Sequence, residues 1–344
     1  MAKNKKKKIL ISGYIGFQNF GDDVMLQILV EHLKEKNCEI TALSSDPDET
    51  RKMFKINALK YKSLTAILKG IISSNIVISG GGNLIQNETS NSSLFYYLFI
   101  IFLSKLFFKK VILYSQGIGP VKGWFSTFLT KTVLKTANLI TVRDVYSQRI
   151  LHKWKTGSRF TYDACWSFKT PAYKPENIVG LQVRDYKFLH KDFYKTLAKY
   201  VDMFFSNFEI RIYSMQNKND LKCCYDLEKA LKQRNADLKT QIILYKNPEF
   251  TAQEFSKLKY LIAMRLHAII LGLNIGVKVL PVSYDVKVKN VACEFGLRYA
   301  EASKEINFHE MLTELMINNN ANPKIENARK RQFEWSYIDA IINK

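Results

Sequence analysis

The strongest constraint on the fold is an alternation of short β-branched runs with helical patterns, which occurs twice along the chain. Such alternation is typical of parallel sheets covered by helices. The runs that predict strands in the first half are residues 8–14, 39–45, 75–81, 110–117 and 138–144. After a proline-containing segment, the runs 177–185, 209–216, 240–246 and 277–284 repeat the pattern. We therefore predict an α/β protein with two Rossmann-like, doubly wound domains.

The chain has 344 residues, which is the length of two domains rather than one. We place one domain at residues 1–168 and the other at 176–322, and we expect a terminal helix over 323–344 to pack back across their junction. Residues 251–264 are also predicted to be helical. Ligands of open parallel sheets bind beyond the carboxyl ends of the strands, so we expect a ligand site in a central cleft between the domains.

The chain is strongly basic, with 52 Lys and Arg against 31 Asp and Glu, a net charge of +21. Nucleic acid, anionic lipid and acidic substrates are the partners that such a charge favours. The aromatic residues lie mainly in core-like runs rather than between basic residues, so no nucleic-acid partner is expected. The apolar segment 93–108 contains Lys105 and is shorter than the roughly 20 residues of a membrane span. We hypothesise peripheral contact with an anionic membrane face.

The five cysteines form no Cys-x-x-Cys pair, which favours a reducing compartment. The apolar stretch near the N-terminus is too short for a signal peptide. We therefore expect a cytoplasmic protein, peripheral at the inner face of the membrane if the contact with lipid exists.

Glycines and small polar residues follow the predicted strands of the first domain, in "GYIGFQNFGDD" (13–23), "SGGGNL" (79–84) and "YSQGIGP" (114–120). Glycine lets a ligand approach the backbone amides closely, and a helix N-terminus favours anions. Tight turns would explain the glycines as well, a helix cap would explain Asp22, and a surface salt bridge would explain Arg143. The binding candidates in this domain are Gly16, Asn19, Asp22, Gly80, Gly81, Gly82, Asn83, Gln116 and Arg143.

Basic residues take the same places in the second domain. Arg184 and Gln216 close two strands, and Lys287 follows a third. Arg265 and His267 fall in the first turn of the apolar helix that begins in "MRLHAIILG". A cation there opposes the helix dipole and is comfortable only beside an anion. A histidine tolerated at the edge of a core is the simpler alternative for His267 alone.

Seven segments together, in order and spacing, resemble those of the bacterial polysaccharide pyruvyl transferases. They are "GYIGFQNFGDDVML", "SGGGNLIQNETSNSSLFYYL", "LYSQGIGP", "ITVRD", "YSMQNKND", "MRLHAIILG" and "VSYDVKV". The resemblance covers residues 9–290. It implies a GT-B-like fold and transfer of a pyruvyl group from phosphoenolpyruvate to a saccharide, a lipid-linked or cell-surface polysaccharide precursor. Gln182 and Val183 stand where relatives favour Ser-Leu before the arginine, and Ala164 stands where proline is common.

The donor that the resemblance implies is a small anion with a carboxylate and a phosphate. Arg143, Arg265 and Lys287 are then expected to hold these groups, with amides of residues 80–82, while His267 acts as general acid. No cofactor is expected, and Asp22 and Asp23 are adjacent rather than spaced as metal ligands. The alternative function is a nucleotide-sugar glycosyltransferase, in which Glu249 or Glu294 would hold a ribose.

Overall fold

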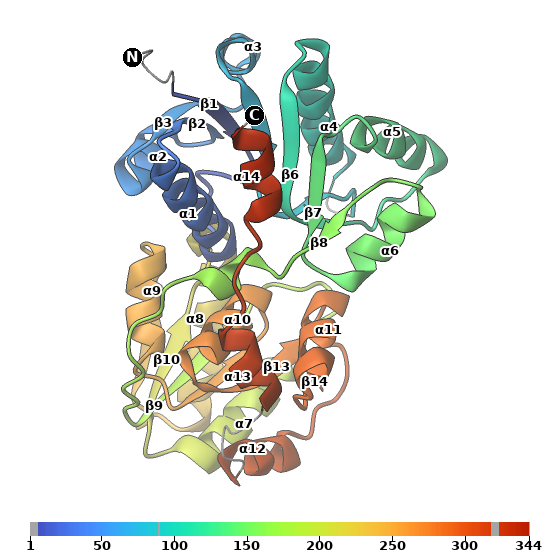
Figure 1. Cartoon of the computed structure of the whole chain (residues 1–344). Helices are drawn as coiled ribbons and strands as arrows, with labels where there is room; N and C mark the ends of the chain where they lie inside the picture. Colours follow the sequence, from blue (N-terminus) through green and yellow to red (C-terminus); the bar gives the residue numbers. More distant parts are fainter. Residues whose placement is uncertain (1–5, 89, 318–322, 344) are drawn as a thin grey trace. The chain divides into compact units, whose positions relative to one another are not determined.

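The computed structural model divides the chain into two compact units, and it describes residues 6–88, 90–317 and 323–343. Unit 1 comprises Met1–Phe17, Gly21–Phe168 and Gln332–Lys344. Unit 2 comprises Gln18–Phe20 and Lys169–Arg331. The chain thus passes from one unit to the other at residue 168, and its last residues rejoin unit 1. Each unit is built on one parallel sheet (Figure 1).

The sheet of unit 1 has the strand order β3-β2-β1-β4-β6-β7-β8, with β5 paired to β6. Its strands are β1 (Lys8–Ser12), β2 (Glu39–Ser44), β3 (Asn57–Lys60), β4 (Ile76–Ser79), β5 (Gly82–Ile85), β6 (Lys110–Ile118), β7 (Leu139–Val142) and β8 (Arg159–Phe160). Its helices are α1 (Phe20–Glu35), α2 (Pro47–Phe54), α3 (Leu64–Ser73), α4 (Asn91–Leu106), α5 (Trp124–Leu134), α6 (Val145–Lys153) and α14 (Ser336–Ile342).

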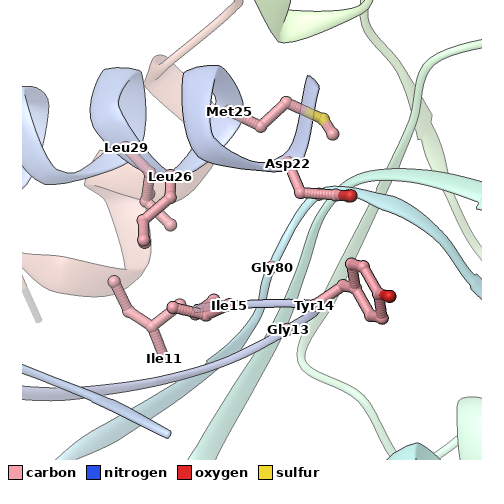
Figure 2. A pocket seen from close by; sticks show the side chains of 10 residues that line it. Ile11, Gly13, Tyr14, Ile15, Asp22, Met25, Leu26, Leu29 and Gly80 are labelled. Atoms are coloured by element: carbon pink, nitrogen blue, oxygen red, sulfur yellow. The ribbon is translucent and has the colours of Figure 1, made fainter. Parts of the chain in front are cut away.

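The central strands of this sheet are apolar on both faces, as buried parallel strands must be. Leu10 and Val77 pack against α3 and α4 on one face. Ile11 faces Leu26 and Leu29 of α1 on the other face (Figure 2). The predicted doubly wound arrangement is therefore confirmed for unit 1. Among the described residues, no helix is both long enough and apolar enough to cross a membrane.

The sheet of unit 2 has the order β11-β10-β9-β12-β13-β14. Its strands are β9 (Ile178–Gln182), β10 (Glu209–Tyr213), β11 (Thr240–Ile243), β12 (Tyr260–Ala263), β13 (Lys278–Ser283) and β14 (Ala300–Glu301). Its helices are α7 (Phe193–Phe205), α8 (Asn217–Arg234), α9 (Pro248–Phe255), α10 (Leu266–Ile275), α11 (Val286–Phe295), α12 (Phe308–Ile317) and α13 (Pro323–Arg329).

The prediction of one helix over residues 251–264 is wrong, because α9 ends at Phe255 and β12 begins at Tyr260. All four residues of β12 are buried, and the strand lies between β9 and β13 at the centre of the sheet. A short, wholly apolar run has no periodicity that separates strand from helix. The close packing of β9 supports the observed strand, since a Cβ on Gly180 would lie 2.6 Å from Leu258 and 3.1 Å from Leu261.

The C-terminal segment forms two helices, α13 and α14, rather than the single predicted helix. Between them, the buried Phe333 and the partly buried Trp335 lie with their ring centroids 4.8 and 5.7 Å from that of Tyr114 in β6. Aromatic packing against the sheet of unit 1 therefore replaces helix in this stretch.

An ion-pair cluster holds α14 to α1. The His32 ring stacks on Trp335 at 3.8 Å, and its Nε2 lies 2.8 Å from an Asp339 carboxylate oxygen. Lys36 Nζ lies 2.8 Å from the other oxygen. Partial burial raises the pKa of Asp339, but the hydrogen bonds from Lys36 and His32 outweigh it, so the pKa is lowered from its usual value.

Asp339→Asn is expected to lower the free energy of unfolding by about 1 to 2 kcal/mol at neutral pH, because Lys36 and His32 lose a charged partner. The folded-state pKa lies below the unfolded value of about 3.9, so this stability is present above that pH and is lost as the pH falls through the folded pKa. Urea denaturation at neutral and acidic pH measures it. Asp48→Asn, at an exposed pair with Arg51, is the control. A difference that is the same in acid would contradict the assignment.

Candidate functional site

Three neighbouring strands of unit 2 bring predicted residues to one edge of the sheet. The strands β9, β12 and β13 are parallel neighbours, so their carboxyl ends meet at the same edge. Arg184 follows β9, Arg265 follows β12, and Lys287 follows β13. Arg184 Nη1 donates to the Tyr284 hydroxyl at 2.7 Å, and its guanidinium lies 4.6 Å from the centre of that ring. A cation–π contact thus joins Arg184 to the loop after β13.

Arg265 has a buried counter-ion that the sequence analysis missed. Its Nε donates to Asp220 Oδ2 at 2.8 Å, and its Nη2 donates to Asp220 Oδ1. Asp220 is fully buried in the first turn of α8 and also accepts the backbone amides of Met215 and Gln216 at 3.0 and 3.1 Å. Burial lowers the pKa of Arg265, but the charge of Asp220 and its hydrogen bond outweigh burial, so the pKa lies above its usual value. Arg265 is therefore charged and held in place by Asp220, and it needs no anionic ligand for this.

Two buried amide side chains position the start of α10. The Gln182 Oε1 accepts from the Arg265 amide at 2.7 Å, while its Nε2 donates to the Val183 carbonyl at 2.7 Å. Gln216 Oε1 accepts from Arg265 Nη2 at 3.4 Å and from Asn19 Nδ2 at 3.4 Å. Asn19 belongs to unit 2, although the sequence places it in the first domain. Gln182, which stood out only as a departure from the family pattern, thus orients the helix that carries His267.

His267 and Lys287 occupy equivalent places on neighbouring helices. Each is the second residue of its helix, α10 or α11, and each is partly exposed. Lys287 lies in a first helical turn rather than at the strand end where the sequence placed it. Asp285 caps α11 by accepting from the Lys287 amide at 3.0 Å, and its carboxylate lies 3.8 Å from Lys287 Nζ. The N-termini of α10 and α11, with Arg265 and Lys287 beside them, therefore share one edge, which favours an anionic ligand.

In unit 1, Arg143 is paired inside the protein rather than at its surface. Its Nη1 donates to Asp163 Oδ2 at 2.8 Å, and both side chains are less than a tenth exposed. Burial lowers the pKa of Arg143, but the charge of Asp163, with smaller contributions from other groups, outweighs burial, so the pKa lies above its usual value. A Cβ on Gly117 would lie 3.5 Å from Arg143 Nε and 2.7 Å from Asn83 Oδ1. Glycine at 117 therefore lets Arg143 and Asn83 approach the end of β6.

The three glycines at 80–82 pack closely against their neighbours, Gly80 against β1 and Gly81 and Gly82 against α1. The Gly80 amide donates to the Ser12 carbonyl at 2.6 Å, so it already has a partner within the chain, and its predicted contact with a ligand stays a prediction. A Cβ on Gly81 would lie 2.6 Å from the Met25 sulfur. Gly82 has a φ of +106°, and a Cβ there would lie 2.9 Å from Asp22 Oδ1. The cavity beside them measures about 10 Å³, room for about one water molecule.

Two further candidates of unit 1 have structural roles. Gly16 has a φ of +80°, and a Cβ there would lie 2.7 Å from the Asp46 amide, so close packing requires glycine. Gln116 is fully buried and donates from Nε2 to the Gly80 and Tyr114 carbonyls. Its Oε1 and the Oδ1 of Asn83 are buried with no hydrogen-bond partner in the described part of the chain. Asn83 Oδ1 and Gln116 Oε1 are thus two acceptors to which a ligand could donate a hydrogen bond.

Asp220→Asn is expected to destabilise the protein by about 3 to 5 kcal/mol, because it leaves the Arg265 charge buried without its counter-ion. Urea denaturation measures the loss. Asp226→Asn on the same helix removes an exposed pair with Lys222 and should change the free energy of unfolding by at most about 0.5 kcal/mol. If the two substitutions lowered the free energy of unfolding equally, the pairing of Asp220 with Arg265 would not contribute more than an exposed ion pair.

The sequence model of a family described as polysaccharide pyruvyl transferase matches residues 19–286. Among curated proteins, none matches the chain significantly.

Several solved structures share the fold. A protein of Listeria monocytogenes described as a UDP-N-acetylglucosamine 2-epimerase has a TM-score of 0.65 at 12% identity, covering 98% of this chain and 95% of its own. HepE of Anabaena, in complex with UDP and glucose, has a TM-score of 0.63 at 11% identity and covers 94% of both chains. UDP-GlcNAc 2-epimerase of Neisseria meningitidis, bound to UDP-GlcNAc, has a TM-score of 0.60 at 13% identity, covering 98% and 100%. The two Rossmann-like sheets are those of a GT-B-like fold.

Proposed function

The chain belongs to the polysaccharide pyruvyl transferase family, and on that basis we propose that it transfers the pyruvyl group of phosphoenolpyruvate to two hydroxyls of a saccharide. The products are a pyruvate ketal and inorganic phosphate. The observation that carries the proposal is the cationic edge of unit 2, where Arg184, Lys287 and the N-termini of α10 and α11 follow neighbouring strands. A donor with a carboxylate and a phosphate is the chemistry that such an edge favours.

Arg265 and Arg143 were expected to hold the carboxylate and phosphate of the substrate, and the structure adds that each is paired with an aspartate. Both are held by buried aspartates, at distances of 2.8 Å. A paired arginine still offers N–H groups in fixed directions. Its side chain therefore loses little conformational entropy when phosphoenolpyruvate binds. We propose that Arg265, on unit 2, orients phosphoenolpyruvate. We propose for Arg143, on unit 1, the same role of holding an anionic group of that substrate.

His267 is the proposed general acid. Ketal formation requires a proton on the methylene carbon of phosphoenolpyruvate, which becomes the methyl group. One sugar hydroxyl then adds to C2 and loses its proton, phosphate leaves with the C–O bond electrons, and a second hydroxyl closes the ring. The two hydroxyl protons restore His267 and protonate phosphate. The reaction needs no cofactor, and imidazole is suited to the proton transfer at neutral pH.

The saccharide is proposed to bind at the carboxyl edge of unit 1. Asp22 in the first turn of α1 and Tyr14 after β1 point to the same side, away from the apolar side chains of Ile11, Leu26 and Leu29 (Figure 2). A carboxylate beside a phenol can accept and donate hydrogen bonds to sugar hydroxyls. Asp22 is thus the proposed base or orienting group for an acceptor hydroxyl.

We place the reaction in the cytoplasm. All five cysteines are free thiols in the structure. Free thiols, two of them adjacent and buried at Cys223 and Cys224, suit a reducing compartment.

His267→Ala should lower kcat by about 100-fold to 10,000-fold and leave the KM for phosphoenolpyruvate nearly unchanged, because it removes the proton donor and leaves Arg184 and Lys287 to hold the substrate. Release of phosphate from phosphoenolpyruvate in the presence of candidate saccharides measures the rate. His152→Ala, at the exposed end of α6, serves as the matched control. A kcat near that of the unmodified protein would remove His267 from the reaction.

Lys287→Met should instead raise the KM for phosphoenolpyruvate by about tenfold to 100-fold, since a charge-assisted hydrogen bond contributes about 1.5 to 3 kcal/mol. Lys289→Met is the control, because Lys289 lies on the same helix and is exposed. The same steady-state assay separates the two constants. If both variants raise KM equally, the effect is one of general charge and Lys287 does not contact the donor.

A nucleotide-sugar glycosyltransferase is the second candidate, favoured by the fold shared with HepE in its complex with UDP and glucose. Of the two glutamates suggested for a ribose, Glu294 lies at the last turn of α11, remote from the cationic edge, and pairs with Arg331 at 2.6 Å. Glu249 lies in the first turn of α9, at the carboxyl edge. Release of nucleoside diphosphate from a panel of sugar nucleotides, without phosphate release from phosphoenolpyruvate, would decide for this function.

A further inference from the structure

One face of unit 1 exposes large apolar side chains that nothing in the described chain covers. We call it the α4–α5 face and define it by Phe99, Phe102, Leu106, Phe108, Trp124, Phe125 and Phe128. Phe108 is 96% exposed and Trp124 is 82% exposed, and the others are 42–61% exposed. Scattered exposed apolar residues are normal, but a contiguous group of this kind marks an interaction surface.

The α4–α5 face is continuous across its two helices. Phe95, Phe99, Phe102 and Leu106 follow each other at steps of four, three and four residues, so they form one stripe along α4. The Phe95 and Phe125 rings meet edge to face with centroids 6.3 Å apart. Helix α5 therefore extends the stripe at its N-terminal end, and Figure 1 shows the two helices as neighbours.

The sequence around this face is predominantly basic, although the Glu88 carboxylate lies 3.7 Å from Lys122 Nζ. Between Glu88 and Asp144 the sequence contains no Asp or Glu, whereas it contains Lys105, Lys109, Lys110, Lys122, Lys131 and Lys135. Lys122 and Lys135 are exposed, and the other four are partly exposed. The face is therefore apolar at its centre and basic at its margin. Two copies of the chain meeting through it would bring their lysines together, which disfavours a self-association.

We propose that the α4–α5 face docks on the surface of an anionic phospholipid bilayer. Aromatic side chains, tryptophan above all, favour the boundary between headgroups and acyl chains. Each lysine near an anionic surface adds electrostatic attraction, which salt weakens. Helix α4 spans 16 residues and does not meet the requirements of a membrane span, so it lies in the plane of the interface. Binding to lipid requires no substrate, and this proposal therefore stands or falls separately from the proposed function.

Cosedimentation of the full chain with vesicles tests the proposal. Vesicles of neutral phosphatidylcholine are compared with vesicles that also contain phosphatidylglycerol. We expect binding to the anionic vesicles, weakened at high salt. The variant Phe108→Ser/Trp124→Ser/Phe128→Ser should bind at least about tenfold more weakly, and so should Lys122→Glu/Lys135→Glu. The same numbers of changes on unit 2, Phe188→Ser/Met203→Ser/Tyr225→Ser and Lys191→Glu/Lys239→Glu, all at exposed residues, are the matched controls.

Trp124 provides a readout at the face itself. Its fluorescence should shift to shorter wavelength when anionic vesicles are added, and Trp124→Phe should abolish the shift while keeping binding within about twofold of the original, because Phe also favours the interface. No binding to anionic vesicles would overturn the proposal. Binding that the unit 2 variants weaken as much as the unit 1 variants would overturn it also. A dimer in sedimentation that only the unit 1 variants dissociate, without vesicle binding, would show that a second copy covers the face.

Discussion

The buried pair of Arg265 and Asp220 is the interaction on which the candidate site depends. It joins the N-terminus of α10 to the first turn of α8, and Asp220 also accepts two backbone amides after β10. Because both groups are charged and buried, neither can turn to solvent without losing its partner. The pair thereby fixes the direction of α10 and the place of His267 at the edge of the sheet.

Unit 1 uses the same device at its own edge. Arg143 after β7 is paired with Asp163, and Gly117 leaves the space that the guanidinium needs. Gly81 and Gly82 are required for close packing of α1, and Gly80 lies close to the backbone of β1, so close backbone packing shapes this edge of the sheet. Buried Asn83 and Gln116 oxygens without partners in the described chain are the polar groups that this packing leaves.

Much of the fold could be predicted because its central strands are long apolar runs bounded by glycine or polar residues. The errors have physical causes. Residues 260–263 are apolar throughout, and only their place between β9 and β13 shows that they form a strand. The stretch around Phe333 and Trp335 has a helical pattern, yet packing against Tyr114 holds it out of a helix. Short strands such as β3, β8 and β14 have too few residues to show a period.

Residue types and their order along the chain determined the fold class, the family and the cationic edge of unit 2, because parallel strands place their following residues at one edge whatever the details of packing. Tertiary structure alone decided how the charges are used. Asp220 is distant in sequence from Arg265, and Asp163 from Arg143, so no local pattern could reveal that both arginines are already paired. The glycines at 80–82 look alike in sequence, and only the tertiary structure shows that Gly80 packs against β1 whereas Gly81 and Gly82 pack against α1.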